Sequence, residues 1–319
     1  MEKKTDNTVL SNGVIVNDIF YPKKNLPSAT LRIVLTTQCN YRCKYCFAEG
    51  EVDKELRELD IEKLKKIIKV SKEFGITSIK LTGGEPLLYP KIEELLSYIR
   101  EIGIPYIDLT TNISLLNDKN VNMLNKYNVN ALTLSLNTLD KEKFVHLSGF
   151  NNADLMFSNL ENVMKAFKGK LRVNCIVFDE KYSMKDYNDI LELCKKNDLG
   201  LRFVEPSVVD DLPITYTKEK FKEHIAYVKS KSNKIIKSDC KSVEYVFFGD
   251  WYLTIMHSLC DNKICDACKD YMYLRITSDL KLKPCLVRRD TEVAIGTKND
   301  EEIRQAFVKA ISFMGVGIK

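Results

Sequence analysis

Short apolar segments alternate with helix-periodic segments along the first two thirds of the chain. Six apolar segments of strand length stand at residues 31–36, 78–82, 105–111, 130–136, 171–178 and 199–205. Stretches with the 3.6-residue period of an amphipathic helix lie between them, at 60–75, 91–103, 118–127, 154–169 and 186–200. Several of these stretches begin near Asp and end at Gly, as helix caps do. This alternation predicts βαβ units that form a parallel sheet.

Six such units fit an open barrel as well as a doubly wound sheet, and the pattern alone does not choose between them. In both folds, functional groups gather at the carboxyl ends of the parallel strands. Polar motifs stand at those ends: "TTQCNYRC" after the first segment, "TGGEP" after the second, "TTN" after the third and "SLN" after the fourth. We therefore expect the functional site at this edge of the sheet.

The alternating pattern stops after residue 205. The rest of the chain contains a predicted helix at 217–230, an aromatic strand-like run at 243–257, further cysteines and a predicted final helix at 300–315. We expect three parts, which are an N-terminal extension (1–30), a barrel-like domain (31–206) and a smaller C-terminal subdomain (207–319).

Composition narrows the class of protein. The 319 residues are 45% hydrophobic and 29% charged, which is ordinary for a globular protein. The first residues carry no signal-peptide pattern, and no apolar run reaches the ~18–20 residues of a membrane span. We therefore expect a cytoplasmic protein without a membrane partner. The net charge of +5 suits an anionic small substrate, and without a concentrated basic stripe we expect no nucleic-acid partner.

In a cytoplasmic protein, the ten cysteines indicate metal binding or catalysis rather than disulfides. Cys39, Cys43 and Cys46 stand together in "CNYRCKYC", directly after the first apolar segment. Structural zinc takes four ligands, and no fourth candidate stands nearby. A 4Fe–4S cluster on three cysteines leaves one iron open for an exogenous ligand. A zinc knuckle or reduced core thiols are the alternative interpretation.

The C-x3-C-x2-C spacing, with aromatic Tyr45 before the last cysteine, resembles the signature of the radical SAM superfamily. The resemblance implies that the open iron binds S-adenosylmethionine. Reductive cleavage then gives a 5′-deoxyadenosyl radical, which abstracts a substrate hydrogen. It also implies an α/β fold, namely a partial (β/α)6 TIM-like barrel with a smaller C-terminal subdomain that holds an auxiliary cluster.

Two further motifs carry the same resemblance. "TGGEP" matches the superfamily motif that binds the methionine amino group. The residue types suit that role, since glycines allow a close backbone approach and Glu85 offers a carboxylate to an ammonium group. "TLSLN" resembles the fourth-strand segment, in which Ser135 would contact the cofactor. The cofactor-binding residues that the resemblance implies are Tyr45, Gly83, Gly84, Glu85, Pro86 and Ser135.

A second group of cysteines has metal-site spacing. Cys265 and Cys268 form a CxxC and Cys285 follows in "LKPC", which suits zinc or an iron–sulfur cluster. Cys260 is a candidate fourth ligand and His257 a weaker one. The remaining thiols are Cys175 and Cys194, which we expect in the core, and Cys240, which stays unassigned.

From residue 30 to about residue 290 the motifs resemble the MoaA family, the GTP 3′,8-cyclases of molybdopterin biosynthesis. The resemblance implies a second 4Fe–4S cluster on Cys265, Cys268 and Cys285, whose unique iron binds the purine while basic residues hold the triphosphate. The substrate-binding residues carried over by position are Arg32, Lys80, Thr111, Arg172 and Arg275.

The chain departs from that family in its last third. The loop after the CxxC is three residues longer, Tyr273 stands where the family has an arginine, and Ser207 stands where it has a methionine. The final "FMGVGIK" also lacks the family's terminal double glycine. Losing an arginine from a triphosphate clamp removes one charge-assisted contact.

Three functions fit these observations to different degrees. The first is MoaA-like lyase chemistry on a nucleotide or a related anionic small molecule. The second is a peptide-modifying radical SAM maturase with one auxiliary cluster. The altered loop favours it, but the short N-terminal extension leaves no room for a peptide-recognition domain. The third, a zinc-binding nucleic-acid module, does not explain "TGGEP". We expect the first, with two 4Fe–4S clusters, S-adenosylmethionine and a one-electron donor such as a flavodoxin or ferredoxin.

Overall fold

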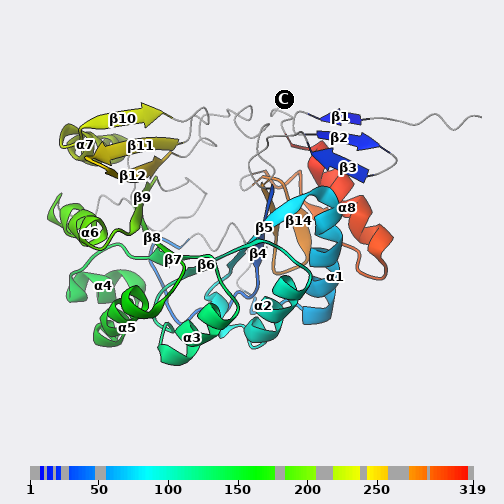
Figure 1. Cartoon of the computed structure of the whole chain (residues 1–319), viewed down its shortest axis with the longest axis horizontal. Helices are drawn as coiled ribbons and strands as arrows, with labels where there is room; N and C mark the ends of the chain where they lie inside the picture. The colour runs from blue at the N-terminus through cyan, green and yellow to red at the C-terminus, as the bar shows by residue number, and fades with distance from the viewer. Residues whose placement is uncertain are drawn as a thin grey trace, which may run out of the picture. The chain divides into compact units, whose positions relative to one another are not determined.

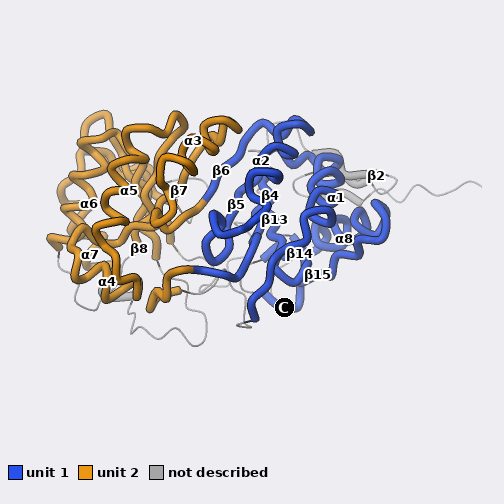
Figure 2. Tube along the Cα trace, turned by 90° about the horizontal axis from the view of Figure 1, so that it is seen from below, with its two compact units in different colours: residues 1–39, 48–109, 264–319 blue, residues 40–47, 110–263 orange. Residues whose placement is uncertain are grey.

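The computed structural model, drawn in Figure 1, describes ten stretches of the chain. They are residues 8–10, 13–16, 19–22, 29–46, 55–176, 184–205, 218–237, 243–257, 273–285 and 288–314. The chain forms two compact units, coloured separately in Figure 2. The first unit contains residues 1–39, 48–109 and 264–319, and the second contains 40–47 and 110–263.

The first unit is built on strands in the order β6-β5-β4-β13-β14-β15. Neighbours among β6 (Tyr106–Thr111), β5 (Ile76–Thr82), β4 (Ala29–Val34) and β13 (Tyr273–Ile276) run parallel. The antiparallel strands β14 (Lys281–Lys283) and β15 (Val293–Ala294) extend this sheet. Near the N-terminus, β1 (Thr8–Leu10), β2 (Gly13–Val16) and β3 (Ile19–Pro22) form a separate antiparallel sheet.

The helices of this unit are α1 (Ile61–Ser71), α2 (Ile92–Glu101) and α8 (Asp300–Ser312), with the 3-10 turns η2 (Lys72–Phe74) and η3 (Pro86–Leu88). Helix α1 begins at an Asp60 cap, whose carboxylate accepts the Lys63 N–H at 2.9 Å. Its continuation η2 ends at Gly75, whose φ of 78° is the left-handed conformation that glycine adopts at low cost. Leu64, Ile67, Ile68 and Val70 of α1 are fully buried, as its amphipathic pattern predicts.

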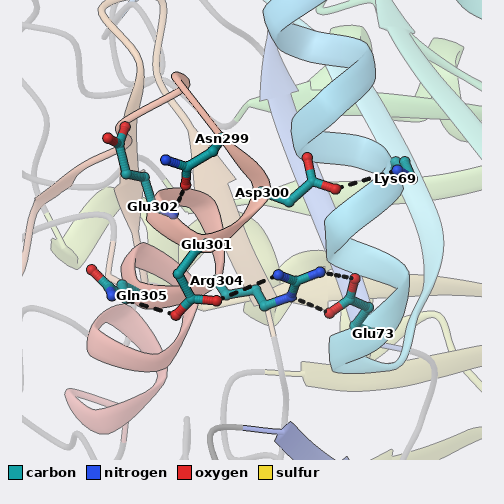
Figure 3. A network of polar contacts seen from close by, with 8 residues as sticks. All are labelled: Lys69, Glu73, Asn299, Asp300, Glu301, Glu302, Arg304 and Gln305. Carbon is teal, nitrogen blue, oxygen red and sulfur yellow. Dashed lines mark hydrogen bonds and ion pairs between the residues drawn. The ribbon is translucent and has the colours of Figure 1, made fainter.

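The last helix is fixed to α1 and η2 by one apolar and two polar contacts. Phe307 of α8 stacks on Phe74, with 4.9 Å between the ring centroids. Around this contact, Arg304 donates to both Glu73 oxygens at 2.7 and 3.0 Å, as Figure 3 shows. Lys69 pairs with Asp300 at 3.3 Å. The C-terminal helix therefore belongs to the core of the first unit.

The second unit has strands in the order β10-β11-β12-β9-β8-β7. Neighbours among β7 (Ala131–Ser135), β8 (Lys170–Ile176), β9 (Gly200–Val204) and β12 (Trp251–Met256) run parallel. The strands β11 (Val243–Phe248) and β10 (Lys234–Lys237) follow in antiparallel pairs. Its helices are α3 (Asp118–Lys126), α4 (Lys141–Ser148), α5 (Ala153–Ala166), α6 (Met184–Lys196) and α7 (Lys218–Ser230).

The strand predictions are confirmed, because the six apolar segments are the parallel strands β4 to β9. The predicted α/β class and the parallel strand framework of a partial barrel are therefore present. The helices expected at 217–230 and 300–315 are α7 and α8. The aromatic run at 243–257 is a hairpin of β11 and β12 that turns at Gly249, where φ is 68°. The expected division at residues 30 and 206 stays a prediction.

Two smaller expectations also have an outcome. Cys175 and Cys194 are fully buried, as expected of core thiols. Within the described stretches, none of the helices has the length and apolar character that crossing a membrane requires.

Candidate active site

The "TGGEP" segment forms a tight turn directly after β5 and holds the chain that leads into the cysteines. Gly84 donates its N–H to the Thr36 carbonyl at 2.7 Å, and Glu85 donates to the Gln38 carbonyl, also at 2.7 Å. A Cβ on Gly84 would lie 2.1 Å from the Gln38 carbonyl oxygen. At Gly83, φ is 155° and a Cβ would lie 2.5 Å from the Thr36 oxygen. Both glycines are therefore required for this backbone approach.

Glu85 and Pro86 complete the turn. Glu85 is fully buried, and its carboxylate accepts the Leu87 N–H at 3.1 Å as the cap of η3. Pro86 occupies the first position of that turn, where a missing N–H costs nothing. The carboxylate is thus hydrogen-bonded just after the carboxyl end of β5, and its cofactor-binding role stays a prediction.

Residues 40–46 of the cysteine loop belong to the second unit, where a side-chain network fixes their start. Asn112, which follows β6, donates to the Asn40 side-chain carbonyl at 2.9 Å. Asn40 donates to the Ser114 hydroxyl at 2.8 Å, and that hydroxyl donates to Asn112 at 2.6 Å. This closed set of hydrogen bonds was missed by sequence analysis, although "TTN" was singled out.

Helix α4 supports the same loop from a second direction. Arg42 donates its N–H to the Ser148 carbonyl at 2.7 Å, and Lys44 donates to the Leu147 carbonyl at 3.0 Å. Tyr41 is buried and stacks on Phe150, with 4.8 Å between ring centroids. The loop is therefore anchored by backbone and aromatic contacts on both sides of Arg42. No helix was predicted at α4, which is short.

The three signature cysteines differ in exposure. Cys39 and Cys43 are half-buried, Cys46 is exposed, and Tyr45 between the last two is half-buried. Across the described residues, no three Cys, His, Asp or Glu side chains are close enough to hold a metal ion together. The fit to a 4Fe–4S cluster therefore rests on the donor set: three accessible thiols on one short loop, which starts at the glycine turn.

Basic side chains form a row across the sheet of the first unit. The register places Lys80 of β5 beside Arg32 of β4, Arg32 beside Arg275 of β13, and Arg275 beside Lys283 of β14. Partners in register project from the same face of a sheet. We call Lys80, Arg32, Arg275 and Lys283 the cationic row. Its first three members are residues that the sequence analysis assigned to substrate binding.

Carboxylates stand at both ends of the cationic row. Asp108 is in register with Lys80, and its carboxylate lies 3.2 Å from the Lys80 ammonium. Both side chains of this pair are about 10% exposed, so solvent screens the pair little. At the other end, Glu292 lies 2.7 Å from the buried Lys283 ammonium.

Tyr273 connects the two central arginines of the row. Its hydroxyl accepts a hydrogen bond from Arg32 at 3.3 Å, and its ring centroid lies 4.9 Å from the Arg275 guanidinium carbon. Arg32 also donates to the Thr82 hydroxyl at 3.5 Å. Burial raises the pKa of Tyr273, but the charges of Arg32, Arg275 and Lys80 outweigh burial, and the net pKa lies below its ordinary value.

The remaining predicted contact residues belong to the second unit. Arg172 of β8 donates to the Thr133 hydroxyl at 3.4 Å, beside Gly200 in register on β9. Thr111 is buried, and its hydroxyl accepts the Ile113 N–H at 3.2 Å. Ser135 is half-buried at the carboxyl end of β7. The predicted cofactor and substrate roles of these residues stay predictions.

A pocket of about 440 Å³ lies within the second unit, along β8, β9, β11 and β12. Arg172 and Arg202 supply positive charge to it, and Tyr245, Trp251 and Tyr252 supply aromatic surface. The Trp251 indole N–H donates to the Leu199 carbonyl at 3.1 Å, which fixes the ring in the wall. Because Asp198 and Asp250 also line it, the pocket combines aromatic surface with both guanidinium and carboxylate groups, which suits a planar polar ligand.

Most of the second cysteine group, namely Cys260, Cys265 and Cys268, lies outside the described residues, as do the unassigned Cys240 and Ser207. Cys285 is described and half-buried, and its sulfur accepts the Arg288 N–H at 3.4 Å. Backbone N–H groups directed at cysteine sulfur are a feature of iron–sulfur sites, where they tune the potential.

His257, the weaker ligand candidate, lies between two carboxylates. Its ring nitrogens are each 3.6 Å from a carboxylate oxygen, one of Glu205 and one of Glu244. Burial raises the pKa of Glu244, but the positive charges around it, with Lys229 first, outweigh burial, and the net pKa lies below its ordinary value. At 3.6 Å both contacts are longer than a hydrogen bond, so they place the ring beside two carboxylates, and a ligand role of His257 stays a prediction.

Comparison with known proteins assigns the family. The model of the radical SAM superfamily matches residues 33–194, which include the cysteine loop, the glycine turn and strands β5 to β8. The chain belongs to the radical SAM superfamily. It is therefore an enzyme of a family that uses a 4Fe–4S cluster and S-adenosylmethionine, as the signature predicted.

Within that superfamily, the chain is similar over most of its length to proteins named probable GTP 3′,8-cyclase. The protein from Methanococcus vannielii is 28% identical over 292 residues, covering 88% of this chain and 93% of the relative. The one from Methanothermobacter marburgensis is 27% identical over 296 residues, covering 89% and 94%. The predicted MoaA-like resemblance is thus confirmed as a similarity.

Solved structures share the fold. Streptococcus suis SuiB bound to S-adenosylmethionine matches with a TM-score of 0.61 at 20% identity, covering 81% of this chain and 60% of SuiB. The chain thus spans less than two thirds of SuiB. The anSMEcpe enzyme with bound AdoMet and the Kp18Cys peptide matches with a TM-score of 0.61 at 16% identity, covering 90% of this chain and 83% of that enzyme.

Proposed function

We propose that this enzyme cleaves S-adenosylmethionine reductively at a 4Fe–4S cluster held by Cys39, Cys43 and Cys46, and abstracts a hydrogen atom from an anionic small molecule. The substrate would be a nucleotide, as in GTP 3′,8-cyclases, or a related anion. The observation that carries the proposal is the cationic row. Three of its members, Arg32, Lys80 and Arg275, are in register on neighbouring strands and are also the residues for which the family resemblance implies substrate binding. Similarity to the probable GTP 3′,8-cyclases supports the same class.

The chain's own residues would position the reactants. When bound, the cluster and S-adenosylmethionine supply the radical that removes the substrate hydrogen. Gly84 and Glu85 hold the chain before Cys39 by backbone hydrogen bonds, and the Asn40–Asn112 contact holds the chain after it. The buried Glu85 carboxylate would receive the ammonium of the methionine group. Arg32, Lys80 and Arg275 would hold the anionic part of the substrate.

A second 4Fe–4S cluster on Cys265, Cys268 and Cys285 completes the proposal. Its support is the cysteine spacing together with the N–H that Arg288 directs at the Cys285 sulfur. If Cys260 is also a ligand, this cluster has no open iron and would relay electrons instead of binding substrate. A flavodoxin or ferredoxin would supply the electron that starts each turnover.

Cysteine variants of the anaerobically reconstituted enzyme test the cluster assignment. The wild type should hold roughly eight iron atoms per chain and form 5′-deoxyadenosine from S-adenosylmethionine and dithionite. Cys39→Ala, Cys43→Ala and Cys46→Ala should each lose about half of the iron and all 5′-deoxyadenosine formation. Cys285→Ala should also lose about half of the iron but keep that reaction. The matched control is the core variant Cys194→Ala, which should keep both. Retained turnover in any of the first three variants would contradict the assignment.

Product analysis tests the substrate class. The reconstituted enzyme is incubated with GTP, S-adenosylmethionine and reductant, and the nucleotides are examined by mass spectrometry. A cyclised nucleotide formed in step with 5′-deoxyadenosine supports GTP as substrate. If 5′-deoxyadenosine forms while GTP stays unchanged, the substrate is another molecule, and a panel of nucleoside monophosphates and carboxylates follows.

A peptide substrate is the second candidate. Peptide-bound enzymes share the fold, and the terminal strand β10 exposes Ile235 and Ile236 to solvent at 42% and 40%. Edge strands with exposed apolar side chains can pair with an extended peptide. Co-expression with a small peptide encoded beside this enzyme tests the idea. A changed peptide mass would favour it, and an unchanged mass would count against it.

A further inference from the structure

Tyr273 occupies the centre of the cationic row, where an anionic ligand would otherwise contact the arginines. Its hydroxyl accepts a hydrogen bond from Arg32 at 3.3 Å. Its ring lies against the guanidinium of Arg275, 4.9 Å from ring centroid to guanidinium carbon. A single phenol therefore engages both central arginines, one through its oxygen and the other through its π face.

The flanks of the row limit the space for negative charge. Lys80 is paired with the Asp108 carboxylate at 3.2 Å, and Lys283 with the Glu292 carboxylate at 2.7 Å. An anion that extended from the central arginines toward either flank would approach a largely buried carboxylate. The negative charge of the anion and that of the Asp108 or Glu292 carboxylate would repel each other strongly, because little solvent screens them there. The row is therefore attractive at its centre and much less so at its ends.

We propose that Tyr273 is a specificity determinant that restricts the cationic row to one compact anionic group, a single phosphate or a carboxylate. The inference rests on the proposed function, in which this row holds the anionic part of the substrate. A triphosphate needs several guanidinium donors along its length, whereas a single phosphate needs one fork of two. Tyr273 already accepts from one terminal nitrogen of Arg32, and the flanking carboxylates disfavour the remaining phosphates.

The phenol also makes this selection depend on pH. Charged groups face it from three strands, Lys80 on β5, Arg32 on β4 and Arg275 on β13, and they lower its pKa below the ordinary value. Asp108 lies beside Lys80, and Lys283 lies beside Arg275. Once Tyr273 loses its proton, a negative oxygen lies 3.3 Å from the Arg32 guanidinium and competes with any anion there. Anion affinity should therefore fall as pH rises toward the ordinary tyrosine value.

Anions that carry no nucleobase test whether the cationic row prefers a single anionic group, and the reconstituted full-length enzyme is used. Inorganic phosphate, acetate and tripolyphosphate are titrated calorimetrically into the wild type and Tyr273→Phe. The wild type should bind phosphate or acetate at least as tightly as tripolyphosphate. Tyr273→Phe, which releases one Arg32 donor, should raise tripolyphosphate affinity about five- to twentyfold and phosphate affinity less than about twofold. The matched control Tyr98→Phe, which removes a hydroxyl bonded to the Lys65 carbonyl, should change neither.

Three outcomes would overturn the inference. In the first, the wild type binds tripolyphosphate more than about tenfold tighter than phosphate. In the second, the wild type binds none of the probes. In the third, Tyr273→Phe leaves the tripolyphosphate affinity unchanged. If the variant does not fold, the wild type alone decides. Its phosphate affinity between about pH 8 and about pH 10, where phosphate keeps one charge state, should fall together with the appearance of tyrosinate absorbance. A constant affinity across that range would overturn the inference as well.

A separate measurement distinguishes this inference from the proposed function. Reductive cleavage of S-adenosylmethionine is recorded on the same preparations. Absence of cleavage in the wild type contradicts the proposed function whatever the probes do. Cleavage without the expected anion preference contradicts the role of Tyr273 and leaves the cluster assignment intact.

Discussion

The side-chain amide of Asn112 donates to the side-chain carbonyl of Asn40 at 2.9 Å, joining two loops that are 72 positions apart in the chain. One of these loops carries Cys43 and Cys46, and the other follows β6. Asn112 is 9% exposed and also accepts from the N–H and hydroxyl of Ser114. The polar network therefore determines where the cysteine loop begins.

Asn112→Ala should loosen that loop. Asn112 takes part in three buried hydrogen bonds, and their removal should lower the free energy of unfolding by about 1–3 kcal/mol. The residues that lose these bonds lie beside the proposed cluster ligands. We expect lower iron retention during gel filtration and 5′-deoxyadenosine formation slower by about tenfold. Asn125→Ala is the control, because Asn125 on α3 bonds to the Ala166 carbonyl and the Lys168 N–H rather than to the cysteine loop. Equal iron content and rate in both variants would contradict the role of Asn112.

Gly84→Ala should disrupt the glycine turn, because its methyl group would lie 2.1 Å from the Gln38 carbonyl oxygen. Backbone must move to relieve this overlap, which costs roughly 1–3 kcal/mol and shifts the chain before Cys39. We expect 5′-deoxyadenosine formation to fall at least about 100-fold, since small misplacements have effects of that size.

Gly103→Ala is the matched control for that change. Gly103 has a positive φ, 78°, which Gly84 does not have, and a Cβ there meets no atom within 4 Å. Gly103→Ala should lower the free energy of unfolding by only about 1–2 kcal/mol, because alanine disfavours the left-handed conformation, and it should keep the reaction rate. Equal loss of rate in the two glycine variants would mean that close approach at Gly84 is not the cause.

Phe307→Ala and Arg304→Ala should separate apolar from ionic contributions to docking of α8. Phe307 is fully buried against Phe74, so its truncation should lower the free energy of unfolding by about 3–5 kcal/mol. Arg304 and Glu73 are 31% and 39% exposed, and their pair should contribute less than about 1 kcal/mol. Urea denaturation measures both. A larger loss for Arg304→Ala would contradict this ranking.

Buried thiols should make the enzyme less stable in alkali. Burial raises the pKa of Cys194 from 9.0 to about 12. Its folded pKa lies above its unfolded pKa, so the stability it contributes is fully present below about pH 9 and is lost as pH rises toward 12. The free energy of unfolding should fall by up to about 1.4 kcal/mol per pH unit for each such thiol.

Cys194→Ala should flatten this alkaline slope. Leu191→Ala on the same helix is the control, because it removes buried apolar surface without removing a titratable group and should shift the curve by a constant amount. Unfolding curves recorded between about pH 8 and about pH 11 distinguish the two. Parallel curves for the wild type and Cys194→Ala would contradict the linkage.

Local rules explain what the sequence predicted correctly. Strands β4 and β5 carry fully buried apolar side chains at alternate positions, Leu31 and Ile33 on β4 and Ile79 and Leu81 on β5, and this two-residue period is typical of a strand. The glycine turn was predicted because a close backbone approach requires residues without a side chain, whatever the surrounding fold.

Contacts between distant polar residues could not be predicted in this way. Arg32 and Tyr273 are 241 positions apart, and their contact depends on β13 adding to the edge of β4. The Asn40–Asn112 network likewise joins loop residues that have no periodic pattern. Helix α4 was missed because it is only eight residues long and weakly amphipathic.

Trp251 in the wall of the 440 Å³ pocket is the sole tryptophan of the sequence. Its indole is hydrogen-bonded to the Leu199 carbonyl, and Tyr252 also lines the pocket. Indole emission responds to the polarity of its surroundings, so the fluorescence of the native enzyme is a built-in optical reporter of this one place. Candidate ligands can therefore be screened against the unlabelled protein, with Trp251→Phe as the reference that has no indole emission.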